Sequence, residues 1–208
     1  MDVLSGTYAP AEIRFYRGLG GGKFAAHVVI EEQYDETAMM ACTNAADFDG
    51  DGDLDLIIGD VKGAVFLNRN VGTPKEFRFG AREALKLASG APLRVCQKSD
   101  PLPVDWDGDG RLDLLVGDEA GDATFFRGRA DGAFEAGVSL FTGESHEKPT
   151  FSAVRASLGE TPTIPGYRLR LAVADWNRDG ALDLLIGNCE TTEQGTTGHV
   201  RVLLRVKS

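Results

Sequence analysis

The sequence contains few of the residues on which most zinc sites and nucleophilic sites depend. Among 208 residues there are three histidines and three cysteines. Cys42, Cys96 and Cys189 lack the close spacing of a metal-binding motif, so we expect buried free thiols. No apolar run approaches the roughly 20 residues that a membrane helix needs. Acidic residues outnumber Lys and Arg and leave a net charge of −10, which argues against nucleic acid as a partner because phosphate contacts need clustered cations.

Glycine and aspartate are abundant instead, and they gather in a motif that occurs three times. The copies are DFDGDGDLDLIIG (47–59), DWDGDGRLDLLVG (105–117) and DWNRDGALDLLIG (175–187). The end of the motif also matches DVLSG at residues 2–6. Such self-similarity indicates a repeat architecture in which each copy marks one structural unit.

The segments around each motif are typical of short strands. They are rich in Val, Ile, Leu and Phe, they partly alternate, and Gly, Asp and Asn bound them, without a sustained helical period. About four strands in roughly 60 residues is the size of a β-propeller blade. We therefore predict an all-β chain of about three and a half four-stranded antiparallel blades, at 1–36 (partial), 37–90, 91–141 and 142–208. Residues 141–167 form an enlarged loop in this prediction.

Each motif begins with an acidic loop whose spacing is that of a metal site. Counting from the first Asp, short oxygen side chains occupy positions 1, 3, 5 and 9, Gly occupies position 6, and position 7 varies. This pattern lets a tight loop curl around one ion, with position 7 contributing its backbone carbonyl. The predicted ligands are Asp47, Asp49, Asp51, Asp53 and Asp55 in the first loop, Asp105, Asp107, Asp109, Arg111 and Asp113 in the second, and Asp175, Asn177, Asp179, Ala181 and Asp183 in the third.

Calcium is the ion that these loops favour. An oxygen-only site of irregular geometry suits Ca²⁺ better than the smaller, octahedral Mg²⁺, and the absence of His and Cys from the loops disfavours zinc and copper. An EF-hand is excluded because its bidentate Glu at position 12 is replaced by Ile58, Val116 and Ile186. The alternative is that the Asp-Gly pairs only form turns. Three copies of the same spacing favour the metal, and the third loop, with one charge fewer, should bind it more weakly.

At these loops the sequence resembles the FG-GAP and VCBS repeat family, which also includes the propellers of integrin α-subunits. The resemblance implies a propeller, usually seven-bladed, with each calcium loop joining the first two strands of a blade. We expect this chain to be an N-terminally truncated fragment of such a propeller, because its first blade lacks an inner strand and its last an outer one. The resemblance to secreted bacterial proteins also implies an extracellular, periplasmic or cell-surface location.

The function that follows is a non-catalytic, calcium-stabilised scaffold for binding or adhesion, whose ligand is a protein or a polysaccharide. The alternative is the propeller portion of a carbohydrate-active enzyme such as a polysaccharide lyase. Aromatic residues recur at loop position 2 and favour packing between blades over stacking on sugars. Arginines recur where each third strand ends. They form a ring of positive charge that could bind an anionic glycan, but surface salt bridges to the abundant acids are the commoner outcome. These residues are Phe48, Trp106 and Trp176, and Arg69, Arg127 and Arg205.

Overall fold

The computed structural model of the chain describes residues 1–8, 11–32, 42–141, 145–146 and 167–205. Within these ranges it contains strands and turns but no helix, and the strands pair in antiparallel sheets. The prediction of an all-β chain built from propeller blades is therefore confirmed. Most of the predicted enlarged loop at 141–167 lies outside the described residues.

Four main sheets follow one another along the chain. The first has the order β1-β2-β5, formed by Val3–Gly6, Glu12–Tyr16 and Val28–Glu32, with a small hairpin of β3 (Gly18–Gly20) and β4 (Lys23–Phe24) beside it. The second has the order β6-β7-β8-β9, formed by Cys42–Ala46, Asp55–Gly59, Val65–Asn68 and Glu83–Ala84.

The third sheet has the order β10-β11-β12-β13-β14, formed by Asp100–Val104, Asp113–Gly117, Ala123–Phe126, Gly137–Ser139 and Ser145–His146. The two-residue β14 is an addition to the four strands that we predict for a blade. The fourth sheet has the order β15-β16-β17, formed by Tyr167–Ala174, Asp183–Thr192 and Gly195–Leu203.

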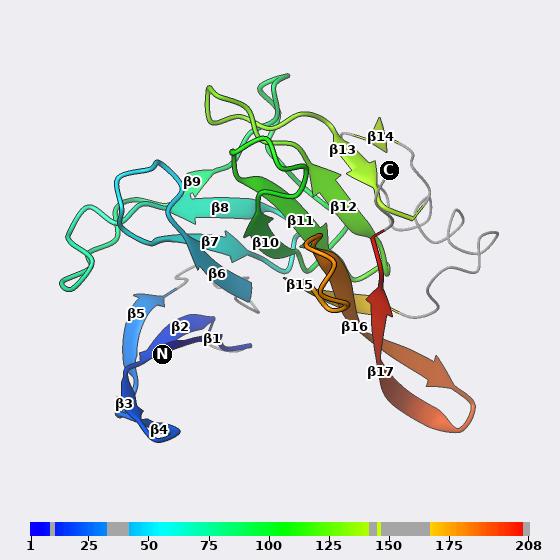
Figure 1. Cartoon of the computed structure of the whole chain (residues 1–208), viewed down its shortest axis with the longest axis horizontal. Helices are drawn as coiled ribbons and strands as arrows, with labels where there is room; N and C mark the ends of the chain where they lie inside the picture. The colour runs from blue at the N-terminus through cyan, green and yellow to red at the C-terminus, as the bar shows by residue number, and fades with distance from the viewer. Residues whose placement is uncertain (9–10, 33–41, 142–144, 147–166, 206–208) are drawn as a thin grey trace.

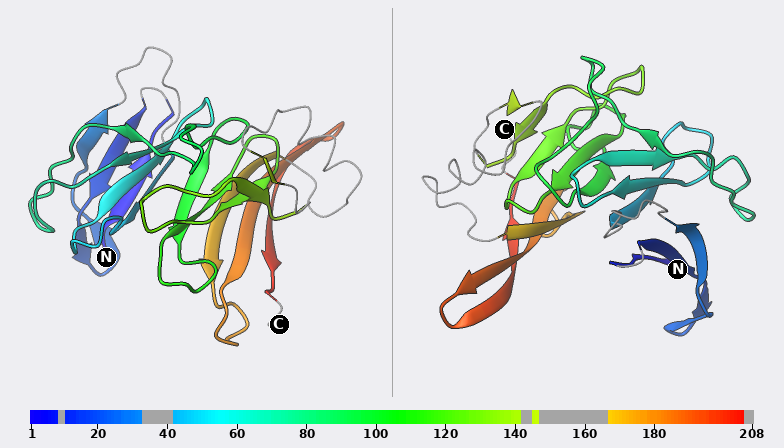
Figure 2. Two further views of the ribbon diagram at one scale, coloured as in Figure 1. Left: turned by 90° about the horizontal axis from the view of Figure 1, so that it is seen from above. Right: turned by 180° about the vertical axis from the view of Figure 1, so that it is seen from behind.

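The sheets lie side by side in an arc, with the first sheet at one end and the fourth at the other (Figure 1). Views from two further sides show the same order (Figure 2). The strands β6, β10 and β15 begin three successive sheets, and in each of them the predicted acidic loop connects this first strand to the second. All three loops therefore occupy equivalent places in neighbouring blades.

The core lies between the sheets, because the second strand of each blade is apolar on both faces. Every residue of β7 and β11 is buried. Ile57 packs with Leu114 of the following sheet, while Leu56, on the other face of β7, packs with Leu4 of the preceding one. Leu115 of the third sheet packs in the same way with residues of the fourth. Continuous apolar runs in the sequence thus correspond to strands that are covered on both sides.

The glycine that ends the repeated motif is required by the close approach of the next blade. A Cβ atom on Gly59 would lie 2.1 Å from the carbonyl oxygen of Ser99, and one on Gly117 would lie 2.6 Å from that of Leu169. Any side chain at these two positions would push the neighbouring backbone away. The repeated motif therefore contains two separate features: the acidic loop, and a glycine that lets the neighbouring blade pack closely.

Candidate metal centres in the acidic loops

The first two acidic loops each bring three carboxylates together. In the first, ligand atoms of Asp47, Asp49 and Asp51 all lie within 4.8 Å of one another, and in the second the same holds for Asp105, Asp107 and Asp109. These are positions 1, 3 and 5 of the predicted sites. Part of each cluster is exposed to solvent, so an ion can reach the oxygens without an opening of the fold.

The backbone of each loop wraps around the carboxylate at position 1. Asp105 accepts hydrogen bonds from the backbone N–H groups of Gly108 at 2.8 Å and of Asp109 and Gly110 at 3.0 Å. Asp47 accepts from Gly50 and Gly52 in the same manner. The tight wrapping fixes where the first carboxylate lies and turns the others toward it.

Glycine at position 6 adopts the left-handed backbone conformation that the predicted sharp turn needs. The φ angles of Gly52, Gly110 and Gly180 are 92°, 84° and 85°. Position 4 is also left-handed: it is glycine in the first two loops, but in the third it is Arg178 with φ 61°. A residue with a Cβ atom is strained there, so the third loop differs from the others in backbone as well as in charge.

The third loop keeps the same wrapping with a carboxamide in place of one carboxylate. Asp175 accepts from the backbone N–H groups of Asp179 and Gly180, both at 2.9 Å, and Asp179 accepts from that of Ala181 at 2.8 Å. The side chain of Asn177 donates to Asp179 at 3.0 Å. The fold of the loop thus tolerates Asn at position 3, with one negative charge fewer for a cation.

The aspartate at position 9 holds the blade together. Asp55, Asp113 and Asp183 are almost completely buried, at 1%, 0% and 0% exposure. One oxygen of each accepts the backbone N–H of position 2, and the other accepts the backbone N–H of a residue just after the third strand. The pKa values of Asp55 and Asp113 are raised, because burial raises them by more than these backbone hydrogen bonds lower them. Their predicted part in metal binding stays a prediction, as does that of the backbone carbonyls of Asp53, Arg111 and Ala181.

The arginines that end the third strands pair with the acidic loops. Arg69 contacts Asp49 at 2.9 Å, and Arg127 contacts Asp107, so both carboxylates at position 3 have a cationic partner. In the third loop, which belongs to the fourth sheet, position 3 is Asn177, and Arg205 instead donates to the backbone carbonyl of Trp106 at 2.7 Å. For Arg69 and Arg127, the salt bridges expected from the sequence are confirmed.

Two of the three aromatic residues at loop position 2 pack between blades. Phe48 lies 6.2 Å, ring centre to ring centre, from Phe134, and the guanidinium of Arg205 lies 4.9 Å above the ring of Trp106. Trp176, in the last sheet of the described chain, is 60% exposed. The predicted packing between blades is thus confirmed for Phe48 and Trp106 and is wrong for Trp176.

Comparison with known families agrees with this geometry. A family model described as an FG-GAP-like repeat matches residues 1–58 and 105–186, which together make up more than half of the chain and contain all three acidic loops. The chain belongs to the FG-GAP-like repeat family. No curated protein and no protein of solved structure matches it.

One further position of the FG-GAP-like repeats was not singled out from the sequence, although it also recurs. The residue after the final glycine of each motif is Asp60, Asp118 or Asn188. Asp60 accepts the backbone N–H of Ala64 at 2.8 Å, and Asp118 accepts those of Gly121 and Asp122 at 3.0 Å. Asp60 and Asp118 thus close the hairpin between the second and third strands of their sheets. Asn188 instead lies within the longer β16-β17 pairing, opposite His199, and its side chain accepts from Arg201 at 3.1 Å. The recurrence of Asp after the motif is the signal that points to the turn in the second and third sheets.

Among the residues that the structure describes, no helix has the length and apolarity needed to cross a membrane.

Proposed function

We propose that the acidic loops of this FG-GAP-like propeller module are calcium sites, and that the module is a non-catalytic extracellular scaffold for binding or adhesion. The observation that carries the proposal is the convergence of three carboxylates in each of the first two loops, with ligand atoms within 4.8 Å. A hard, oxygen-only ligand set on an irregular loop suits Ca²⁺. The third loop offers the same frame with a carboxamide at Asn177.

The repulsion between the loop carboxylates supports the presence of a divalent ion, because the arginine partners alone do not compensate it. Two unit charges about 5 Å apart repel by about 1 kcal/mol in bulk water, and by several times more near a protein surface. Each of the first two loops contains three such pairs. Arg69 pairs with the first loop, and Arg127 and Arg111 pair with the second, but each exposed salt bridge offsets only about 0–1 kcal/mol. The arginines therefore compensate only part of the repulsion. A divalent ion would compensate the rest, and its binding free energy would add to the stability of the fold.

The extracellular assignment rests on the chemistry of such loops. Oxygen sites in extracellular modules commonly bind Ca²⁺ with dissociation constants of about 10⁻⁴–10⁻³ M, which match millimolar calcium outside cells. A surface, secreted or periplasmic setting would keep these sites filled. The partner in this proposal is a protein or a polysaccharide, bound on the face away from the acidic loops.

Two thiols support a non-catalytic role. Burial raises the pKa of both Cys42 and Cys96 to about 11. Both thiols are therefore protonated at neutral pH and are poor nucleophiles. Turnover of an acidic polysaccharide by the purified chain would favour the lyase alternative instead.

The test is a thermal melt with and without chelator, combined with calcium titration calorimetry. We expect chelator to lower the melting temperature strongly, and Ca²⁺ to restore it where Mg²⁺ does so poorly. Asp109→Ala should weaken one site and leave the other two loops competent, and Asp131→Ala, an exposed acid outside the loops, serves as the control. An unchanged melt, or simultaneous loss of all sites in Asp109→Ala, would contradict the proposal.

A further inference from the structure

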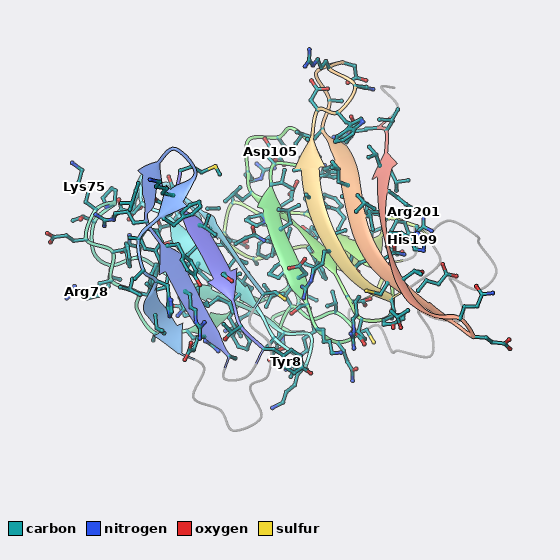
Figure 3. All side chains as sticks on the ribbon, turned by 90° about the horizontal axis from the view of Figure 1, so that it is seen from below. Tyr8, Lys75, Arg78, Asp105, His199 and Arg201 are labelled. Carbon is teal, nitrogen blue, oxygen red and sulfur yellow. The ribbon has the colours of Figure 1, made fainter. Side chains whose placement is uncertain are left out.

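A small cavity opens at the end of the blades opposite to the acidic loops. Its volume is about 290 Å³. Figure 3 shows Tyr8, which lines it, and Asp105 of the second acidic loop at opposite ends of the strands. The walls come from the end of β1, the segment before β10, the turn after β11 and the start of β15. The side chains that matter below are Tyr8, Lys98, Glu119, Arg168 and Arg170.

Cations outnumber the acids that neutralise them around this cavity. Glu119 is shared by two of them: its carboxylate lies 3.0 Å from Nζ of Lys98 and 3.2 Å from Nε of Arg168. Arg170 pairs with Asp100 at 3.1 Å. Among the described residues that line the cavity or pair with its lining, three cations thus face two carboxylates, which leaves one positive charge in excess.

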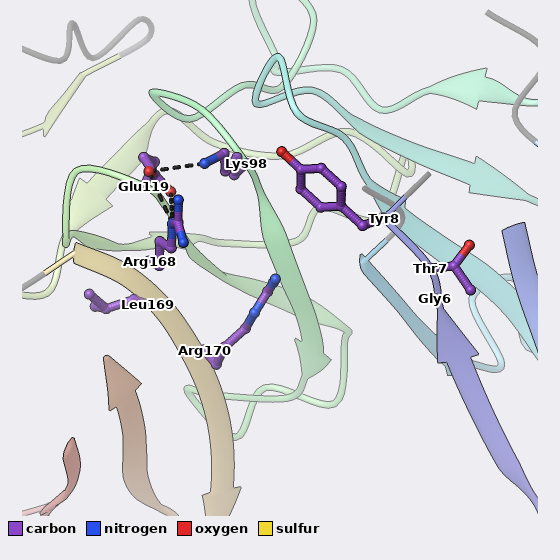
Figure 4. Close-up of a pocket in the computed structure, with 8 residues that line it drawn as sticks. All are labelled: Gly6, Thr7, Tyr8, Lys98, Glu119, Arg168, Leu169 and Arg170. Atoms are coloured by element: carbon purple, nitrogen blue, oxygen red, sulfur yellow. Dashed lines mark hydrogen bonds and ion pairs between the residues drawn. The ribbon is translucent and has the colours of Figure 1, made fainter. Parts of the chain in front are cut away.

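The acids point inward and the arginines outward. The side chains of Glu119 and Asp100 are each 15% exposed, whereas those of Arg168 and Arg170 are 54% and 50% exposed. The hydrogen bonds from Arg168 to Glu119 use Nε, so the outer edge of its guanidinium can donate to a ligand. Tyr8, 54% exposed, stands across the cavity from Arg168 and Glu119, with Lys98 and Arg170 between them (Figure 4).

Two of these cations are held in a strained backbone conformation. Lys98 has φ 50° and Arg168 has φ 58°, in the left-handed region that favours glycine. Hydrogen bonds between blades hold both segments, from the backbone N–H of Lys98 to Val61 and from that of Arg168 to Glu119. Strain that the surrounding structure maintains is common at binding sites. A lysine and an arginine at positions suited to glycine point to a use for their side chains.

We propose that this cavity binds the carboxylate of an acidic sugar, an inference that rests on the proposed function as a binding module. One excess positive charge matches a monoanion better than a doubly charged phosphate. The planar guanidinium of Arg168 suits the two oxygens of a carboxylate. The exposed ring of Tyr8 offers the apolar face on which sugar rings stack. The volume is at the small end of ligand sites and fits a single sugar unit.

The experiment compares two ligands that differ in one group. The calcium-saturated chain is titrated at low salt with methyl α-D-galacturonoside and with methyl α-D-galactoside, and binding is followed by NMR. We expect the acid to bind at least about tenfold more tightly than the neutral sugar, since charge-assisted hydrogen bonds to the carboxylate are the difference. Arg168→Gln should lose about tenfold or more of this affinity. Arg129→Gln is the matched control: Arg129 is similarly exposed and paired with acids, but it lies at the acidic-loop end.

Several results would overturn the inference. Equal binding of the two sugars, no binding of either, or tighter binding of inorganic phosphate or of an aspartate-containing peptide would each do so. Loss of binding in Asp109→Ala but not in Arg168→Gln would show that the acid binds through calcium in an acidic loop. The chelator melt separates the two proposals. If calcium stabilises the chain but the acidic sugar does not bind, only the cavity assignment fails, whereas binding without a calcium effect refutes the calcium sites alone.

Discussion

Oδ1 of Asp113 accepts a hydrogen bond of 2.7 Å from the backbone N–H of Gly128. The other oxygen of Asp113 accepts the backbone N–H of Trp106 at 2.9 Å. A single buried carboxylate thus ties the acidic loop to the chain that leaves the third strand. The same acidic loop therefore contains aspartates with two different surroundings: Asp113 is enclosed by backbone donors, and Asp109 lies at the surface beside the other carboxylates, paired with Arg111.

Because of this difference, we expect two substitutions in the same loop to change the stability of the chain in different ways, one without calcium and one only with it. Asp113→Asn should lower the free energy of unfolding by about 1–3 kcal/mol even in chelator, because the amide group cannot accept all of the backbone N–H bonds. Asp109→Asn should change the metal-free protein little and should lose part of the calcium-dependent gain. Chemical denaturation of both variants in chelator and in excess calcium measures this. Equal destabilisation of the two variants in chelator would show that Asp113 and Asp109 do not differ in their structural contribution to the metal-free chain.

The salt bridge between Arg127 and Asp107 predicts competition between arginine and calcium. The hydrogen bond to Asp107 holds the pKa of Arg127 above its ordinary value, so its charge is always present beside the loop. Arg127→Met should raise the calcium affinity of the second loop by up to about fivefold, the range of an exposed ion pair. Titration calorimetry checks this, with Arg129→Met as the control. A lower affinity in Arg127→Met would mean that the arginine orders the loop for the ion.

The repeated parts of the molecule could be predicted from the sequence because each constraint occurs several times. Gly52, Gly110 and Gly180 share one backbone conformation, and Asp47, Asp105 and Asp175 accept the same kind of hydrogen bonds from their loops. The role of Asp113 could not be predicted in this way. A carboxylate that lies beside other carboxylates and one that accepts backbone N–H bonds recur in the sequence alike, and only the surrounding donors tell them apart.

The cationic cavity could not be predicted either, for another reason. Lys98 and Arg168 lie 70 positions apart in the sequence and belong to no motif that recurs. They meet at Glu119 because successive blades pack against one another and their backbones hydrogen bond across the gap. Such a site depends on how blades are placed relative to one another, which the strand pattern of a single blade does not contain.

The two tryptophans predict a contrast between an interior blade and the last one. Trp106 packs against the core between the third and fourth sheets, while Trp176 is 60% exposed. Trp106→Ala should lower the free energy of unfolding by about 2 kcal/mol through lost apolar burial, and Trp176→Ala should change it by less than about 0.5 kcal/mol. Circular dichroism melts in excess calcium provide the measurement. Equal effects of the two substitutions would indicate that Trp176 is covered in solution.

Asp118 predicts a pH dependence of stability that is separate from calcium. Its side chain is 1% exposed, and burial raises its pKa to about 6 even though backbone N–H groups lower it. Because the unfolded chain has the ordinary pKa near 3.9, the folded state binds more protons between these values. Stability is therefore lost as the pH rises from about 4 to 6, and the ionised form costs about 2–3 kcal/mol above that range.

The variant Asp118→Asn tests whether the stability of the chain falls, as expected, when the pH rises. Asn188 occupies the equivalent position in the fourth sheet, and an amide oxygen can still accept from Gly121 and Asp122. The melting temperature of Asp118→Asn minus that of the unmodified chain should therefore grow as the pH is raised from 4.5 to 7.5 in excess calcium. Asp131→Asn is the control: Arg129 lowers the pKa of Asp131, so this carboxylate is ionised in both the folded and the unfolded state across this range, and its difference should stay nearly constant. A difference for Asp118→Asn that stays constant across this pH range would show that the buried carboxylate does not change its protonation on folding.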